Sequence, residues 1–147
     1  MADIQGFDFR PELYYNIEHV WAKVETDGSV RVGFDDFVAQ GLKSHGNDIF
    51  YIKIAVEGTE IAQNGKLGII ETRKFTGPIT SPVSGVVIAS NPEIPRSYGS
   101  AIKVDPYGEA WLVVIKPSKL EEELKNLMKG ERALEWFKKE IEDSKKG

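Results

Sequence analysis

The residue best placed to do chemistry in this sequence is Lys74, which lies in a short polar segment between two apolar stretches. The stretches that begin at Leu67 and Ile79 have the composition of two arms of a hairpin, so the turn falls near Arg73 and Lys74. A lysine at a protruding turn holds its amine in solvent, where a modifying enzyme can acylate it. A solubilising surface lysine is the alternative, and an isolated Glu-x-x-Lys segment would favour it.

The other polar residues that could do chemistry are better explained by structural roles. Ser81 and Ser84 stand beside a proline and a glycine, which is typical of turns, and the sequence places no histidine near them as a base. Asp35 and Asp36 precede a short helical pattern and favour helix capping. We expect His19 to satisfy a hydrogen bond near a cleft. The absence of Cys excludes thiol nucleophiles and thiolate ligands, and two His are too few for a metal cluster, so we expect no metal site. We also expect no catalytic residue.

Most of the segments that must position Lys74 are predicted to be short strands. An Asp-Gly pair in the middle of 24–32 predicts a hairpin there. A short helix is expected within 33–40. Aromatic and β-branched residues predict further strands, at 49–54, 83–88 and 111–115.

A different pattern, with helical periodicity, follows residue 117. Ser118 and Glu121 fit a capping box that would start one helix, and Gly130 would end it. A second helix should follow, because an apolar residue recurs every three or four positions among charged ones. The apolar stripe of this second helix consists of Leu134, Phe137 and Ile141.

The composition is that of one ordinary folded domain. The 147 residues are 41% apolar and carry 19 Lys plus Arg against 23 Asp plus Glu, a formal charge of -4. A chain of this size buries roughly 68–70% of the surface that its unfolded form exposes, which allows a real core. We expect a single domain over 1–147, with a β core over about 12–117 and a helical C-terminal segment over 118–143 packed on it.

Charge and hydropathy also exclude several kinds of partner. The acidic balance argues against nucleic acids and anionic membranes, because both require clustered Lys and Arg. The longest apolar run, Ala110–Ile115, is far shorter than a bilayer span. The first ten residues lack the apolar centre of a secretory signal. We expect a cytoplasmic location, a monomeric state, and neither a nucleic-acid nor a membrane partner.

Five blocks of the sequence occur in an informative order. Glu71 and Lys74 are followed, seven residues after the lysine, by Ser-Pro-Val-Ser-Gly at 81–85. The other four blocks are Glu-His-Val-Trp at 18–21 and the segments at 33–40, 46–59 and 105–117. In this order they resemble the glycine cleavage H-proteins, over roughly residues 14–140. The lysine stands at the offset of that family's lipoyl attachment site.

The resemblance implies a fold, a cofactor and a kind of activity. The fold would be mainly β with C-terminal helices, a lipoyl/biotinyl-type hybrid barrel in which two antiparallel sheets face each other. Lys74 would form an amide with lipoic acid, on an attachment hairpin that includes Glu71, Arg73 and Phe75. The dithiolane would supply the thiol chemistry that a chain without cysteine lacks, so the protein would be a non-enzymatic carrier. Biotin is the rival group, but biotin carriers usually set the lysine between two methionines.

The sequence departs from the H-protein pattern where that family holds its cargo. In H-proteins, a glutamate of the His-Glu-Trp motif and an aspartate four residues after the lysine help to hold a methylamine-loaded arm in a cleft. These positions are Val20 and Pro78 here, and an ammonium buried without a carboxylate is costly. Glu18 is a possible substitute, and the proline-rich segment 91–99 departs from the family as well. The cleft candidates are Glu18, His19, Val20, Pro78 and Arg96.

These departures favour an H-like paralogue that carries a cargo other than methylamine on the lipoyl group of Lys74. An example is the lipoate-binding protein of heterodisulfide-reductase-like sulfur oxidation, whose neutral or anionic cargo would tolerate the loss of two carboxylates. The alternative is a conventional H-protein, which carries methylamine from glycine decarboxylase to aminomethyltransferase. Expected partners are a lipoate-attaching enzyme and either the heterodisulfide-reductase-like complex or glycine decarboxylase, aminomethyltransferase and dihydrolipoamide dehydrogenase. An unmodified scaffold and a stand-alone enzyme are the other classes.

Overall fold

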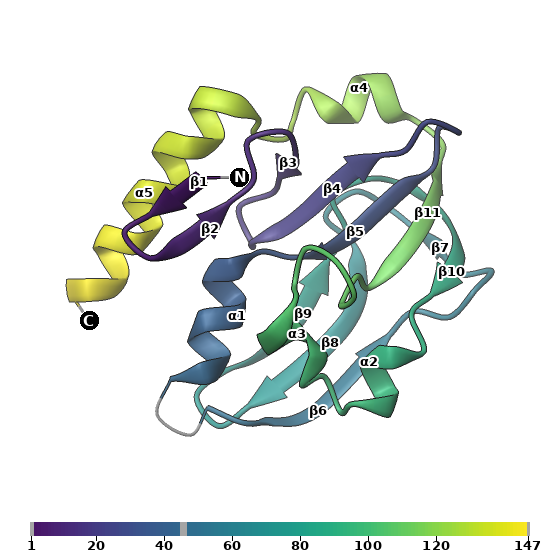
Figure 1. Ribbon diagram of the computed structural model, residues 1–147. Coiled ribbons are helices and arrows are strands. Elements are labelled where there is room, and N and C mark those ends of the chain that lie inside the picture. The colour runs from purple at the N-terminus through teal and green to yellow at the C-terminus, as the bar shows by residue number, and fades with distance from the viewer. Residues whose placement is uncertain (1, 45–46, 147) are drawn as a thin grey trace.

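The structure is a computed structural model that describes residues 2–44 and 47–146 (Figure 1). Its strands are β1 (Ala2–Ile4), β2 (Phe7–Phe9), β3 (Tyr14–Tyr15), β4 (Val20–Val24), β5 (Val30–Phe34), β6 (Ile49–Ile54), β7 (Glu60–Ile61), β8 (Lys66–Thr72), β9 (Thr76–Thr80), β10 (Gly85–Ser90) and β11 (Val113–Pro117). Its helices are α1 (Asp36–Lys43), α2 (Glu93–Arg96), α3 (Ala101–Val104), α4 (Leu120–Leu124) and α5 (Gly130–Lys146).

Two antiparallel sheets enclose the main core. The larger has the strand order β3-β4-β5-β11-β10-β7, and the smaller has the order β6-β8-β9. Val32 and Ile115 of the larger sheet and Ile70 and Ile79 of the smaller one belong to the same buried apolar cluster. Figure 1 shows the two sheets as separate layers, with α5 and the β1–β2 hairpin to one side. The expected architecture, mainly β with two facing antiparallel sheets and C-terminal helices, is confirmed.

The hairpin predicted over 24–32 is formed by β4 and β5. At its turn Asp27 accepts hydrogen bonds from the backbone N–H and hydroxyl of Ser29, and Gly28 has a φ of 88°. That left-handed conformation suits a glycine, which is why the Asp-Gly pair was informative. The strands predicted at 49–54, 83–88 and 111–115 correspond to β6, β10 and β11, with the last two displaced toward the C-terminus by about two residues.

The helix predicted to begin after Ser118 and to end at Gly130 is wrong at both ends. The cap position is Lys119, which makes no side-chain cap bond, and the backbone N–H of Ser118 donates to the carbonyl of Ser84. α4 ends at Leu124, since the chain then forms an antiparallel bridge from Met128 to β3. Gly130, with a φ of 61°, starts α5. Pairing with a distant strand therefore overrides the local helical signals.

The second helix was predicted correctly, and it packs on a hairpin that the sequence did not reveal. Phe137 and Ile141 are fully buried, and Leu134 is partly buried beside them. Phe9 of β2 contacts Phe137, with ring centroids 5.2 Å apart. Strands β1 and β2 are three residues each and precede the expected β core, so they gave no periodicity to recognise. They close a second apolar cluster between α5 and the large sheet.

In the part of the chain that the structure describes, none of the helices is both long enough and apolar enough to span a membrane. Within the same residues, no group of three or more acidic or histidine side chains is arranged to hold a metal ion.

Candidate functional site

Lys74 lies at the tip of the β8–β9 hairpin, in a turn that two neighbouring residues close. The backbone N–H of Thr72 donates to the carbonyl of Phe75 at 2.6 Å, and the N–H of Phe75 donates to the Thr72 hydroxyl at 3.0 Å. These bonds leave only Arg73 and Lys74 at the tip. We call residues 72–75 the Lys74 turn. Lys74 is exposed, and none of the described residues pairs with its ammonium group. Its amine is therefore open to acylation.

The segment that follows α1 braces the Lys74 turn from outside. The Asn47 side-chain carbonyl accepts a hydrogen bond from the backbone N–H of Lys74 at 3.1 Å. The backbone carbonyl of Asp48 accepts one from the N–H of Arg73, also at 3.1 Å. Both bonds hold the backbone and leave the lysine side chain unconstrained. The turn thus fixes the position of the Lys74 backbone and leaves the direction of its side chain free.

The other predicted members of the attachment hairpin lie around this turn. Glu71 is half-buried on β8 and faces Thr76 of β9 across the ladder. Arg73 is exposed at the tip. Phe75 is 55% exposed, and its ring borders a cavity beside the turn. The structure therefore brings Glu71, Arg73, Lys74 and Phe75 together.

A cavity of about 330 Å³ opens next to the Lys74 turn. Apolar side chains from α1 and from the inner face of the small sheet form most of its wall. Its lining residues are Glu18, His19, Phe34, Phe37, Val38, Gly41, Leu42, Asn47, Ile70, Thr72, Phe75, Pro78, Ile79 and Thr80. An exposed amine beside an apolar cavity suits a long neutral arm that can leave the solvent, because apolar burial would stabilise the folded-back arm.

Three of the five cleft candidates line this cavity, and two do not. Glu18, His19 and Pro78 are among the lining residues. Val20 is fully buried in the core, because the side chain that follows His19 on β4 packs between the sheets. Arg96 is exposed on α2, where it pairs with Glu93 at 3.3 Å. The placement of Val20 and Arg96 in the cleft was therefore wrong.

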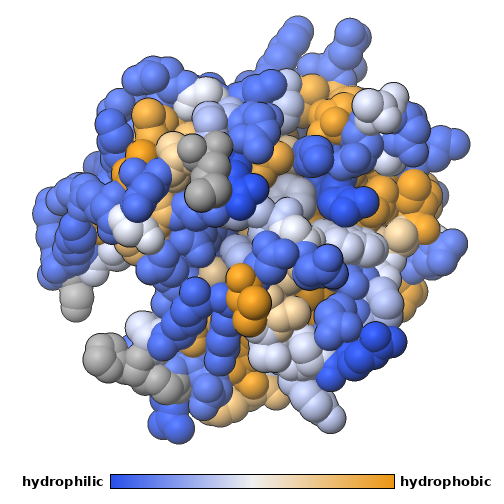
Figure 2. Space-filling view, viewed as in Figure 1, coloured by the Kyte–Doolittle hydropathy of each residue, from blue (hydrophilic) through white to orange (hydrophobic). Residues whose placement is uncertain are grey.

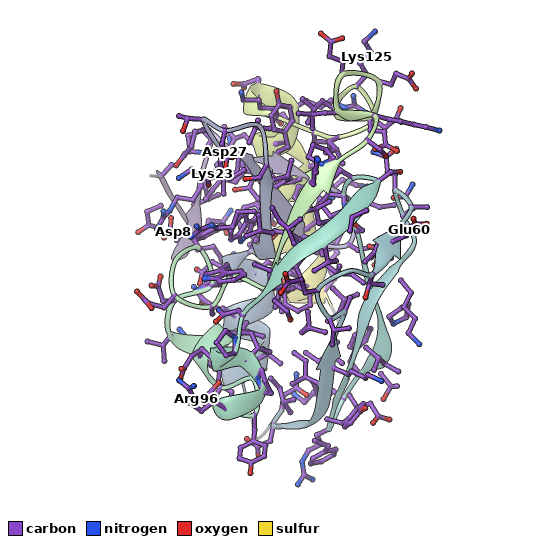
Figure 3. The ribbon with its side chains drawn as sticks, turned by 90° about the vertical axis from the view of Figure 1, so that its right-hand side faces the viewer. Asp8, Lys23, Asp27, Glu60, Arg96 and Lys125 are labelled. Carbon is purple, nitrogen blue, oxygen red and sulfur yellow. The ribbon has the colours of Figure 1, made fainter. Side chains whose placement is uncertain are left out.

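The predicted loop at 91–99 contains the short helix α2. The Asn91 side chain accepts a hydrogen bond from the backbone N–H of Glu93 at 3.0 Å, which helps to start the helix. α2 contacts β6, and Figure 3 shows Arg96 on the outside of the molecule. Since none of its residues lines the cavity, this segment forms outer surface and not cleft wall.

Asn16 holds the turn that brings Glu18 and His19 to the cavity. Its side-chain carbonyl accepts hydrogen bonds from the backbone N–H groups of Glu18 at 2.9 Å and Val20 at 3.0 Å. Its amide donates to the Thr80 hydroxyl at 3.2 Å, which links the turn to β9. We did not predict this residue, although an asparagine before a strand is a common turn signal. Glu18 supplies the one carboxylate among the described lining residues.

His19 is held between two carboxylates, a group that we call the His19 cluster. Its Nδ1 lies 2.7 Å from Asp35, which is completely buried, and its Nε2 lies 2.8 Å from Glu140 of α5. Burial lowers the pKa of His19, but the charges and hydrogen bonds of Asp35 and Glu140 outweigh burial and raise it above the ordinary histidine value. The expected hydrogen bond of His19 is confirmed, and it is made twice. Glu140 could not be predicted because 121 residues separate the partners.

Comparison with known proteins gives one consistent result. A sequence model described as "Glycine cleavage H-protein" matches residues 13–140. A "Probable glycine cleavage system H protein" of Pyrococcus abyssi is 39% identical over 138 residues, which are 94% of this chain and 98% of the relative. "Glycine cleavage system H protein 3" of Aquifex aeolicus is 34% identical and covers 96% of this chain and 87% of the relative.

A solved structure supports the same architecture. The crystal structure of a glycine cleavage system H protein from Mycobacterium marinum superposes with a TM-score of 0.63, over 75% of this chain and 87% of that one. The sequence identity is 23%, so the match shows that the two chains share a fold.

Proposed function

Since this chain belongs to the glycine cleavage H-protein family, whose members are non-enzymatic carriers of lipoate bound to a lysine, we propose that Lys74 is the lipoyl attachment residue. The observation that carries the proposal is the free amine of Lys74 at a braced turn beside an apolar cavity. Other lysines are exposed, but Lys74 combines the tip of a hairpin with such a cavity. The Ser-Pro-Val-Ser-Gly block at 81–85 adds support from the sequence.

The residues of this chain present the amine and shelter what is attached to it. The Lys74 turn offers the amine to a lipoate-attaching enzyme, and Phe75 of the turn borders the cavity. Apolar residues such as Phe37 and Ile79 would exclude water from an arm that folds back. When bound, lipoate supplies a pair of sulfurs that can be reduced, carry a group and be reoxidised.

We further propose the conventional cargo, methylamine carried from glycine decarboxylase to aminomethyltransferase, with dihydrolipoamide dehydrogenase as the third partner. Relatives that align over almost their whole length have glycine cleavage names. Glu18 provides a carboxylate at the cavity, where a cationic amine would need one. It is exposed, so its charge is not costly to maintain when the cavity is empty.

A sulfur cargo handed to a heterodisulfide-reductase-like complex is a second candidate. One observation favours it: Val20 and Pro78 occupy positions where the resemblance implies two carboxylates, and Val20 is buried in the core. With Glu18 alone, the cavity would hold a cation less tightly and would tolerate a neutral group.

We propose that the protein is a cytoplasmic monomer whose contacts with its partner enzymes are transient. Figure 2 shows hydrophobic residues on the visible face as separate patches among hydrophilic ones. A permanent interface usually buries a broad apolar area, which this face does not offer.

Peptide mapping by mass spectrometry tests the attachment site. Protein isolated from its own host under lipoate-replete conditions should carry one lipoyl group, on the peptide that contains Lys74. An unmodified Lys74 alongside fully lipoylated carriers in the same cells would refute the proposal and favour the unmodified scaffold.

Loading by glycine decarboxylase tests the cargo. The lipoylated protein should accept methylamine from glycine, and Glu18→Gln should release it faster, by about tenfold for one lost charge-assisted hydrogen bond. Failure of the fully lipoylated protein to load, with an authentic H-protein loading in parallel, would favour the sulfur cargo.

A further inference from the structure

His19 lies where three separate segments of the chain meet. It belongs to the turn between β3 and β4, and its backbone carbonyl accepts a hydrogen bond from the N–H of Asp35. Its ring stacks on Phe37 of α1, with centroids 4.3 Å apart and planes 11° apart. On α5, Trp136 packs against the same ring at 4.6 Å, and Glu140 contacts its Nε2. One imidazole therefore joins the turn, α1 and α5.

Both ring nitrogens face carboxylates, which determines the charge of this imidazole. A neutral imidazole carries one N–H, so it can donate to only one of the two carboxylates. The second contact, at less than 3 Å between lone pairs, would be repulsive. The two contacts therefore require one proton beyond that of a neutral imidazole, and the raised pKa of His19 assigns this proton to the ring, which then donates to both carboxylates. Complete burial raises the pKa of Asp35, and the imidazolium opposes that rise.

The His19 cluster is connected directly to the cavity wall. Asp35 accepts a hydrogen bond from the backbone N–H of Val38 and so caps α1. The first turns of α1 supply Phe37 and Val38 to the wall, and the stacked ring of His19 is itself a lining residue. The position of α5 is therefore transmitted to the cavity through His19 and Asp35.

The backbone conformation of His19 also indicates that its ring is held in a fixed place. Its φ of 67° is in the left-handed region, which is unfavourable for a residue with a Cβ. The strain is maintained by the surrounding bonds, including the N–H of His19 to the carbonyl of Asn16 at 3.3 Å. Strained backbone persists where the surroundings over-determine it, and here they direct the ring between α1 and α5.

We propose that His19 is a positioning residue which couples helix α5 to the arm cavity, so that the contact with Glu140 keeps the cavity wall in the form that shelters the arm. This inference rests on the proposed function of the cavity, and it adds a role for the C-terminal helix in retaining the arm.

The two carboxylates are not equivalent when the proton is lost. Asp35 is completely buried and also caps α1, whereas the Glu140 side chain is 32% exposed. A neutral His19 would keep its contact with Asp35, and Glu140 would turn to solvent. These two groups face the ring from α1 and α5, and Glu18 is the charged neighbour in its own turn. Deprotonation thus releases α5 first and loosens the wall second.

Glu140→Gln tests the coupling, with Glu135→Gln as the matched control. Glu135 lies on the same helix and is exposed, so the control makes the same charge change away from His19. Methyl NMR of cavity residues such as Val38 and Ile79, recorded before and after lipoylation, reports how often the arm occupies the cavity. The His19 ring resonances report its pKa independently.

We expect Glu140→Gln to lower the pKa of His19 and to reduce the ratio of occupied to open cavity by roughly three- to tenfold. Glu135→Gln should give the same cavity occupancy as the parent protein. In the parent protein, occupancy of the cavity by the arm should fall as pH rises through the His19 pKa. A lowered His19 pKa with unchanged occupancy would overturn the coupling and leave the carrier function intact. Absence of lipoylation at Lys74, or of methyl shifts in the parent, would instead refute the proposed function.

Discussion

The Lys74 turn and the His19 cluster both border one cavity and are built in different ways. The turn is closed by Thr72 and Phe75, three residues apart, and its bracing bonds all involve backbone groups. The cluster joins His19 to Asp35 and Glu140, which are 16 and 121 residues away, and all three side chains can carry charge. The chain thus holds the Lys74 turn with uncharged bonds to backbone groups and builds another part of the cavity wall with ionisable side chains.

This difference predicts which conditions disturb each region. Backbone hydrogen bonds in a two-residue turn are insensitive to pH and salt, so presentation of the amine should be constant. Contacts between a histidine and carboxylates change when a proton is lost or when α5 shifts. Attachment and retention of the arm should therefore be separable by mutation.

The largest effect is expected from Lys74→Arg, which keeps the positive charge but removes the acylable amine. Lipoylation should be lost completely, while the fold and the His19 cluster stay unchanged. Intact-mass measurement after incubation with a lipoate-attaching enzyme gives the result. A variant that still acquires one lipoyl group would show that another lysine is the site.

Phe137→Ala should destabilise the region around the His19 cluster and leave the Lys74 turn unchanged. Phe137 is fully buried against Phe9 and lies near the His19 ring, so its truncation should lower the free energy of unfolding by about 3–5 kcal/mol. Urea unfolding measures the loss. The rate of lipoylation at a temperature where the variant is folded should equal that of the parent. A slowed rate would show that the two regions are not independent.

Stability should decrease as pH rises above neutral. Because the pKa of His19 is raised in the folded state, its contribution is complete below the unfolded value of about 6.5 and is lost as pH passes through the folded pKa. Urea midpoints from pH 6 to 9, below the ordinary tyrosine range, should fall in the parent and fall less in Glu140→Gln. Parallel curves for the two proteins would contradict a protonated His19.

Asn47→Ala should have the smallest effect, away from the His19 cluster. It removes two exposed side-chain hydrogen bonds, one accepted from the backbone N–H of Lys74 and one donated to the Gly41 carbonyl of α1, so we expect a loss of about 0.5–1.5 kcal/mol. Hydrogen exchange at the Lys74 amide should accelerate, and the His19 ring resonances should not move. Simultaneous changes at both places would remove the distinction between the two regions.

The fold was predictable where the signals were local. The Asp27-Gly28 turn and the amphipathic stripe of α5 depend on residues within a few positions of each other, and both were confirmed. The end of the first C-terminal helix was not predictable, because Met128 pairs with Tyr15 of a distant strand. The β1–β2 hairpin was missed for a similar reason, since its strands are ordered by packing on α5.

The same limit applied to the site. The hairpin around Lys74 could be predicted from one continuous segment, and its proposed attachment role from a family resemblance. The cavity wall required α1, the turn at Asn16 and the small sheet to be placed together, so Val20 and Arg96 were assigned to it wrongly. Spacing along a strand shows which face a side chain shares, but not which neighbouring element covers that face.

The short tip of the hairpin has a geometric consequence for any tethered group. With only Arg73 and Lys74 between the closing bonds, the backbone offers almost no swing of its own, and the pivot stays at one point. The end of the tether can then reach points within a sphere around that pivot, and the radius of the sphere is the extended length of the tether. Enzymes that use the same carrier must each bring their reacting groups inside this sphere, and must therefore take turns.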